Sequence, residues 1–156
     1  DAVVRALRAS HPYEEPAFDL VRLAAPLEGV GQGRVGPLDP CPRRDVVERV
    51  KKELGLAHVL VAGPLDGEAR RVAVAAGAAG EMIEDAIRAG ADVFVTGEVR
   101  HHDALAAARR GLAVVATLHS NSERRAVRAL AARAAARLSG IDVRASARDA
   151  DPFTIA

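Results

Sequence analysis

The chain has 156 residues, of which 49% are hydrophobic and 28% are charged, so it can bury the core of one domain or of two small ones. Its 22 basic residues nearly cancel its 21 acidic ones, and the net charge of +1 gives no electrostatic reason to expect nucleic acid or an anionic membrane as a partner. No stretch approaches the roughly 20 apolar residues that a membrane span requires, and we expect a cytoplasmic protein. The single cysteine, Cys41, excludes an internal disulfide and a thiolate-cluster metal site.

The N-terminal stretch predicts a helix followed by a strand. Apolar residues recur at helical spacing over residues 1–10, and the helix opens without a start signal, which suggests further chain upstream. Residues 11–16 form a connector that proline restricts at both ends, and residues 18–23 then alternate like a half-buried strand. A stretch rich in proline and glycine over residues 26–42 interrupts the pattern, so we place a boundary there.

Helices and strands alternate over the rest of the chain. The predicted helices cover residues 45–54, 81–89, 103–110 and 122–138, and the predicted strands cover residues 58–62, 72–76, 93–96, 113–118 and 141–145. Asp45 is suited to cap the first of these helices, and Gly55 to end it. The alternation predicts an α/β fold with a mostly parallel or mixed sheet and helices on both faces. In such folds ligands bind beyond the C-terminal ends of the strands.

One candidate site follows the strand over residues 113–118. His119 ends this strand, and Glu123 lies in the first turn of the next helix if that helix begins near Asn121 or Ser122. A neutral imidazole and a carboxylate are good ligands for zinc, manganese or iron. The alternative is structural, because a serine can cap the helix while Glu123 completes a capping box. The spacing by itself leaves both interpretations open.

A second cluster follows the strand over residues 93–96, and we expect it at the same edge of the sheet. Asp103 is suited to cap the following helix, which would explain its presence without any further function. His101 and His102 are neighbours on a loop, and one of them could reach a metal or a substrate proton. Glu98 could orient a ligating imidazole or act as a base.

Glycines at positions 77 and 80 separate a predicted strand from a predicted helix. Their backbone amides could bind a phosphate, but tight packing between the strand and the helix is the simpler explanation, since no phosphate-binding lysine follows.

Five phrases occur in a characteristic order between His11 and Phe153. They are His-Pro-Tyr-Glu-Glu-Pro-Ala-Phe-Asp, Gly-Gln-Gly-Arg-Val-Gly, Asp-Val-Phe-Val-Thr-Gly-Glu followed by His-His-Asp-Ala-Leu, His-Ser-Asn-Ser-Glu-Arg, and Asp-Ala-Asp-Pro-Phe. Together they resemble the NGG-interacting factor three family, whose bacterial members are often labelled GTP cyclohydrolase I type 2 homologues.

The resemblance implies an α/β protein with a dinuclear metal centre, assembled as a hexameric ring, a trimer of dimers. Many members carry an inserted domain similar to the CutA and PII folds. Residues 1–27 resemble the tail of that insertion, and residues 28–156 resemble the C-terminal part of the metal-binding domain. The N-terminal half of that domain has no counterpart in this sequence.

Carried over residue by residue, the resemblance makes His119 and Glu123 metal ligands, and it makes His102 and Asp103 residues that line the same cavity. The family's other ligands, two histidines and an aspartate, come from the N-terminal half. One histidine and one glutamate do not hold two ions, so we expect this chain alone to bind metal weakly or not at all.

The resemblance favours a metal-dependent hydrolase that acts on a small-molecule substrate. Two divalent ions, zinc, iron or manganese, would activate a bridging water, and His102 or Glu98 would move protons. The alternative is a non-enzymatic role as a metal-handling protein or a ring-shaped interaction scaffold. A trimeric signalling module of the PII type is disfavoured, because the inserted domain is present only in part.

Overall fold

The computed structural model describes residues 2–21 and 31–155, and the chain divides into two units, residues 1–30 and 31–156. In the first unit the predicted helix forms as α1 (Ala2–Ser10), and none of its residues is buried. The predicted strand over residues 18–23 is wrong for residues 18–21, and its last two residues lie outside the described part. A strand requires a neighbouring strand to pair its backbone groups, and the described residues of this unit contain no other.

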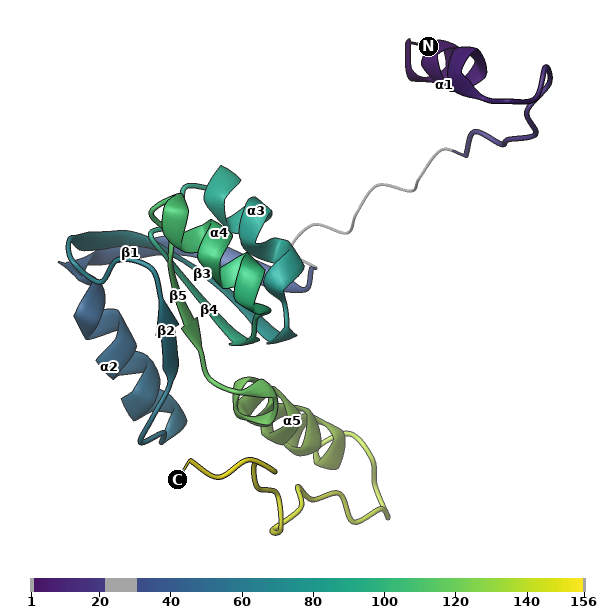
Figure 1. Cartoon of the computed structure of the whole chain (residues 1–156). Coiled ribbons are helices and arrows are strands. Elements are labelled where there is room, and N and C mark those ends of the chain that lie inside the picture. Colours follow the sequence, from purple (N-terminus) through teal and green to yellow (C-terminus); the bar gives the residue numbers. More distant parts are fainter. Residues whose placement is uncertain (1, 22–30, 156) are drawn as a thin grey trace. The chain divides into compact units, whose positions relative to one another are not determined.

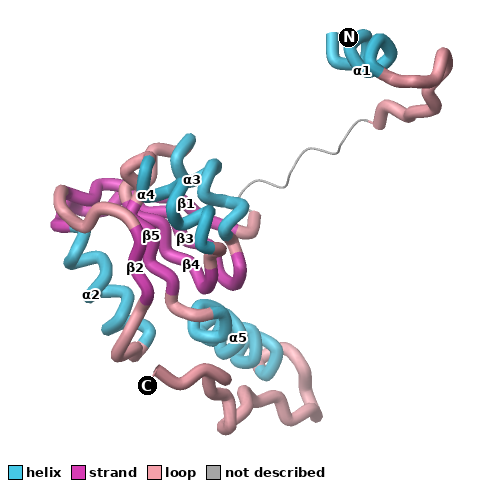
Figure 2. The backbone as a smooth tube through the Cα atoms, in the orientation of Figure 1, coloured by secondary structure: helices cyan, strands magenta, loops and turns pink. Residues whose placement is uncertain are grey.

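The second unit is built on a mixed sheet, which has five strands in the part of the chain that the structure describes. The strands are β1 (Gly33–Pro42), β2 (Leu60–Ala62), β3 (Glu68–Ala78), β4 (Val93–Glu98) and β5 (Ala113–Ala116), in the spatial order β1-β3-β4-β5-β2. The three central strands run parallel, and β1 and β2 pair antiparallel at the two edges. Figure 2 shows the strands in magenta, with helices beside them in cyan.

Helices cover both faces of this sheet, as predicted (Figure 1). They are α2 (Arg43–Leu54), the 3-10 turn η1 (Gly80–Met82), α3 (Ile83–Arg88), α4 (His101–Arg109) and α5 (His119–Ala135). On one face α3 and α4 bury Phe94 and Val114, while on the other face α2 packs Val46 against Val93 and Val115. The two apolar layers hold the central strands rigidly, so the loops that leave their C-terminal ends start from fixed points.

Two predicted features of the sheet are corrected. The stretch over residues 33–42 is not a break but the edge strand β1, which tolerates its prolines because one side of an edge strand needs no backbone donors. A register irregularity between Pro37 and Cys41 accommodates them. The predicted strand over residues 141–145 does not form, and this segment is irregular and mostly exposed.

The strand predicted as buried over residues 58–62 is in fact the short edge strand β2, on which Leu60 is 63% exposed. Helix α2 begins at Arg43, after Pro42, without a side-chain cap, so Asp45 lies in the first turn and does not cap it. Gly55 ends the helix in the left-handed conformation, as predicted. In the part of the chain that the structure describes, no helix combines the length and the apolar character needed to cross a membrane.

Candidate metal centre

The connection between β5 and α5 consists of Thr117 and Leu118, because α5 begins at His119. The prediction that this helix begins near Asn121 or Ser122 is wrong. Leu118 adopts φ 69° and ψ 155°, and it is the one non-glycine residue with positive φ among those described. This backbone region is almost restricted to glycine, and a side chain held there costs about 1–3 kcal/mol. The strained turn starts the helix at once, so His119 and Glu123 lie one turn apart on the same side of α5.

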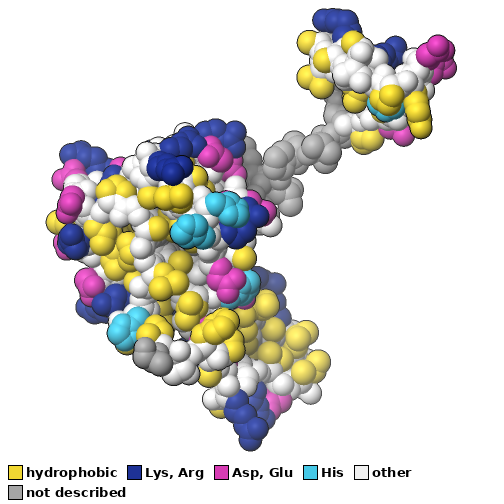
Figure 3. All heavy atoms as spheres, viewed as in Figure 1, with side chains coloured by type: hydrophobic (Ala, Val, Ile, Leu, Met, Phe, Trp, Pro, Cys, Tyr) yellow, Lys and Arg dark blue, Asp and Glu magenta, His cyan; other side chains and the backbone are white. Residues whose placement is uncertain are grey.

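The imidazole of His119 lies between two carboxylates. Its Nδ1 is 3.2 Å from Glu98 Oε2, and its Nε2 is 3.4 Å from Glu123 Oε1. The hydrogen bond to Glu98 raises the pKa of His119 above its ordinary value, the negative charge of Glu123 acts in the same direction, and desolvation opposes both. The three side chains are between 44% and 47% exposed, so a ligand can reach them. Figure 3 shows histidine and acidic side chains next to one another on this face.

Two glycines let the first turn of α5 approach the ends of β3 and β4. A Cβ on Gly97 would lie 2.7 Å from Ser122 Oγ and 2.7 Å from the carbonyl oxygen of Gly77. Gly77 has a φ of +73°, and a Cβ there would lie 3.0 Å from Glu123 Oε1. Side chains at these positions would push the helix away, so the glycines serve close packing.

Hydrogen bonds complete this contact. The amide of Gly77 donates to Ser122 Oγ at 2.8 Å, and that hydroxyl donates to the carbonyl oxygen of His119 at 2.6 Å. The buried hydroxyl of Thr96 donates to the carbonyl oxygen of Gly77 at 3.2 Å. Because the Gly77 amide is already bonded to a side chain, the packing explanation of this glycine is favoured over phosphate binding.

The second predicted cluster lies in the first turn of α4. That helix begins at His101 with Arg100 in the cap position, so Asp103 is not its N-cap. Asp103 instead accepts hydrogen bonds from Arg100 Nε at 2.7 Å and from Arg100 Nη2 at 3.3 Å, and this contact lowers the pKa of Asp103. His102 is 71% exposed, and its Nε2 lies 3.7 Å from Asp103 Oδ1.

The structure brings Glu98 and Asp103 to one hollow of about 470 Å³, which Glu81 and Arg100 also line. His102 does not line it. Glu98 therefore faces two ways, toward His119 and toward this hollow. The sequence singled out Glu98, His119 and Glu123. It offered Ser120 or Ser122 as a cap of the helix, but the helix has no side-chain cap, and the Ser122 hydroxyl bonds the Gly77 amide instead. Nothing in the sequence indicated the strained Leu118.

The chemistry of the donors fits part of a divalent-metal site. The bond from Nδ1 to Glu98 leaves Nε2 of His119 available as a ligand next to the Glu123 carboxylate. No group of three or more histidine, cysteine or acidic side chains is arranged to hold a metal ion within residues 2–21 and 31–155. The described residues thus offer one nitrogen and one carboxylate at this point, which is fewer donors than a closed coordination shell requires.

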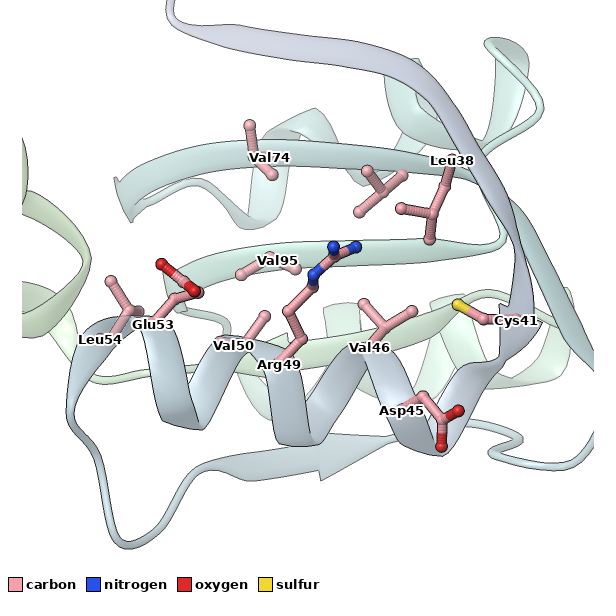
Figure 4. A pocket seen from close by; sticks show the side chains of 11 residues that line it. Leu38, Cys41, Asp45, Val46, Arg49, Val50, Glu53, Leu54, Val74 and Val95 are labelled. Carbon is pink, nitrogen blue, oxygen red and sulfur yellow. The ribbon is translucent and has the colours of Figure 1, made fainter.

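An apolar groove of about 470 Å³ lies elsewhere, between α2 and the sheet (Figure 4). Val46, Val50 and Leu54 of α2 face it, opposite Val74 and Val95 of the strands. None of the candidate metal-site residues lines this groove. Cys41 does line it, as a half-buried residue at the end of β1.

Comparison with known proteins identifies relatives of this chain. The "GTP cyclohydrolase 1 type 2 homolog" of Bacillus subtilis is 34% identical over 98% of this chain and 42% of its own length. The protein of the same name from Halalkalibacterium halodurans is 40% identical over 76% of this chain and 32% of its own length. The "Protein NIF3 homolog" of Schizosaccharomyces pombe is 36% identical over 81% of this chain and 48% of its own length.

A solved Bacillus cereus structure, of a protein related to NIF3, superimposes on 99% of this chain and 44% of its own with a TM-score of 0.72 and 32% identity. The chain thus spans less than half the length of these relatives. The family model described as Duf34/NIF3 (NGG1p interacting factor 3) matches residues 4–152, and the chain therefore belongs to the Duf34/NIF3 family.

Proposed function

We propose that this chain is part of a divalent-metal-binding protein in which His119 and Glu123 are metal ligands. The observation that carries the proposal is the arrangement around His119, whose Nδ1 is bonded to Glu98 while its Nε2 faces the Glu123 carboxylate. Metal-binding histidines commonly have their second ring nitrogen bonded to a carboxylate, which fixes the tautomer and the ring orientation. Glu98 is then the residue that orients His119.

The remaining ligands would come from the part of the full-length protein that this chain does not include, since the chain spans less than half the length of the relatives it matches. Mixed nitrogen and carboxylate ligands suit zinc, iron or manganese. A bound pair of such ions supplies an activated water and polarises the bond to be cleaved.

We further propose that the complete protein is a metal-dependent hydrolase of a small molecule. The name "GTP cyclohydrolase 1 type 2 homolog" of several relatives supports this reaction class. The hollow between Glu98 and Asp103 would hold the substrate, and Glu98 or the exposed His102 would exchange protons with it. The resemblance also supports a cytoplasmic hexamer and the assignment of residues 1–27 to a CutA/PII-like insertion.

The alternative function is a non-enzymatic metal-handling or interaction scaffold. It is favoured by the name of the family, NGG1p interacting factor 3, and by the name "Protein NIF3 homolog" of the Schizosaccharomyces pombe relative. Metal that binds without turnover of any substrate would support it.

The proposal is tested on the full-length protein by metal analysis and by turnover. His119→Ala and Glu123→Ala should each reduce the bound metal, whereas His58→Ala, outside the site, should not. Unchanged metal content in both site variants would contradict the metal assignment. Nucleotides and phosphoesters serve as the substrate panel, and turnover that disappears with the metal distinguishes the enzyme from the scaffold.

A further inference from the structure

We infer that Asp149 and Asp151, in the irregular segment after α5, are positioning residues. They hold in place the first turn of α5, which carries His119 and Glu123. In Figure 1 this segment returns past α5 toward its first turn. As a statement about a metal site, the inference rests on the proposed function. As a statement about the helix, it rests on the contacts described below.

The contacts join the segment to the start of α5 at two points. Arg124 donates to both carboxylate oxygens of Asp149, through Nε and through Nη2, the latter at 3.1 Å. Ser120 Oγ donates to Asp151 Oδ2 at 2.7 Å, and the other oxygen of Asp151 accepts from the amide of Phe153 at 3.0 Å. A bidentate contact between a guanidinium and a carboxylate defines an orientation as well as a distance.

The anchored residues are the direct neighbours of the proposed ligands. Ser120 and Arg124 follow His119 and Glu123 by one position each, so every anchor lies beside a ligand on the same turn. Asn121 continues the network, since its Oδ1 accepts a hydrogen bond from Arg124 and its Nδ2 donates to the carbonyl oxygen of Thr117 at 2.8 Å. If α5 rotated about its axis, both the anchors and the ligands would move.

Apolar burial does not fix α5 in the way that it fixes α2 and α3. No residue of α5 is buried, whereas α2 and α3 each bury two side chains. The position of its first turn therefore depends on polar contacts, those of His119 and Ser122 at the strand ends and those with the segment after α5. Arg124 is only 18% exposed, which sets its ion pair apart from the freely exposed ones.

The segment also contains a matched control. Asp142 pairs with Arg144 within the same segment, and this ion pair involves no residue of α5. Asp142→Asn therefore removes one charge and one ion pair from the segment, as Asp149→Asn does, but leaves the anchors of the helix in place.

The first readout is zinc affinity of the full-length protein, measured by titration against a competing chelator. Asp149→Asn and Asp151→Asn should each weaken zinc binding about 10-fold, in the range typical of residues that support metal ligands, and Asp142→Asn should not change it. Arg124→Lys should behave like Asp149→Asn, because an ammonium group lacks the bidentate geometry. If Asp149→Asn and Asp151→Asn both left the zinc affinity unchanged, the positioning role would be overturned, even if their unfolding midpoints were lower.

The second readout is independent of metal. In the metal-free protein, amide hydrogen exchange of residues 122–126, whose amides bond within the first turns of α5, should accelerate in the Asp149 and Asp151 variants and stay unchanged in the Asp142 variant. If the parent protein binds no zinc through His119, the proposed function fails, but accelerated exchange still supports the anchoring of the helix. Unchanged exchange in all three variants would overturn the inference whatever the zinc titration shows.

Discussion

At the scale of single residues, Leu118 and His119 form the centre of the site. Leu118 is in a backbone conformation that glycine adopts easily, and His119 follows directly with carboxylates on both ring nitrogens. Strained residues persist where the surrounding structure holds them, and they concentrate at functional sites. We interpret the strain as the local consequence of starting α5 so close to the end of β5.

Replacing Leu118 by glycine and by alanine separates this strain from the loss of the side chain. Both variants lose the same apolar contacts, but only glycine relaxes at φ 69° and ψ 155°. Leu118→Gly should therefore be about 1 kcal/mol more stable than Leu118→Ala in denaturant unfolding. At Ala126, inside α5, glycine should instead be the less stable residue by a similar amount. An alanine variant at 118 that matched or exceeded the glycine variant would show that the turn is unstrained.

The pH dependence of His119 provides a second test. Its folded pKa is raised by Glu98 and Glu123, so the protonated imidazole is stabilised in the folded metal-free protein. This contribution to stability is complete below the ordinary pKa of about 6.5 and is lost as the pH rises through the raised value.

An NMR titration of the metal-free protein should give His119 a pKa above its ordinary value, and Glu98→Gln should lower it. Zinc binding should weaken as the pH falls through the raised value, because the proton and the metal compete for the ring. A His119 pKa that Glu98→Gln leaves unchanged would be inconsistent with the hydrogen bond at Nδ1.

At the scale of elements, the contact between α5 and the strand ends depends on glycines, which have no side chain to separate them. Gly97→Ala would place a Cβ within 2.7 Å of Ser122 Oγ and of the Gly77 carbonyl. We expect it to destabilise the fold by about 1–3 kcal/mol in denaturant unfolding and to weaken zinc binding, since the Cα of His119 is also close. Gly36→Ala is the control, because a Cβ there meets nothing within 4 Å. Equal stability of the two variants would refute the close packing.

The sequence predicted the interior elements better than the edges and ends. The central strands and the helices around them show clear periodicity, because burial on the sheet requires it. Strand β1 was missed because proline and glycine are compatible with an edge strand, and the strand over residues 141–145 was wrong because pairing depends on a neighbour. Helices α4 and α5 start earlier than predicted, because neither has the side-chain cap on which the prediction relied.

Part of the candidate site could be predicted in the same way. The rule that loops from parallel strands meet at one edge placed Glu98 near His119, and the structure has them in contact. The roles of Asp149 and Asp151 could not be predicted, because they depend on how an irregular segment folds back onto α5. Local sequence patterns do not specify such long-range contacts.

At the scale of the whole molecule, the chain holds one face of a proposed metal centre. His119 and Glu123 supply a nitrogen and a carboxylate, and the chain spans less than half the length of its relatives. The full-length protein should therefore bind zinc far more tightly than residues 1–156 alone, as measured by parallel titrations. Equal affinities would contradict a site that is shared with the rest of the protein.

The central claim, that His119 binds metal through Nε2 beside Glu123, is tested most directly by anomalous diffraction at the zinc edge from crystals of the full-length protein. The account predicts a zinc peak about 2.0–2.1 Å from His119 Nε2 and about 2.0–2.2 Å from a carboxylate oxygen of Glu123, with Nδ1 still bonded to Glu98. A peak bound through Nδ1, or zinc located away from both side chains, would contradict it.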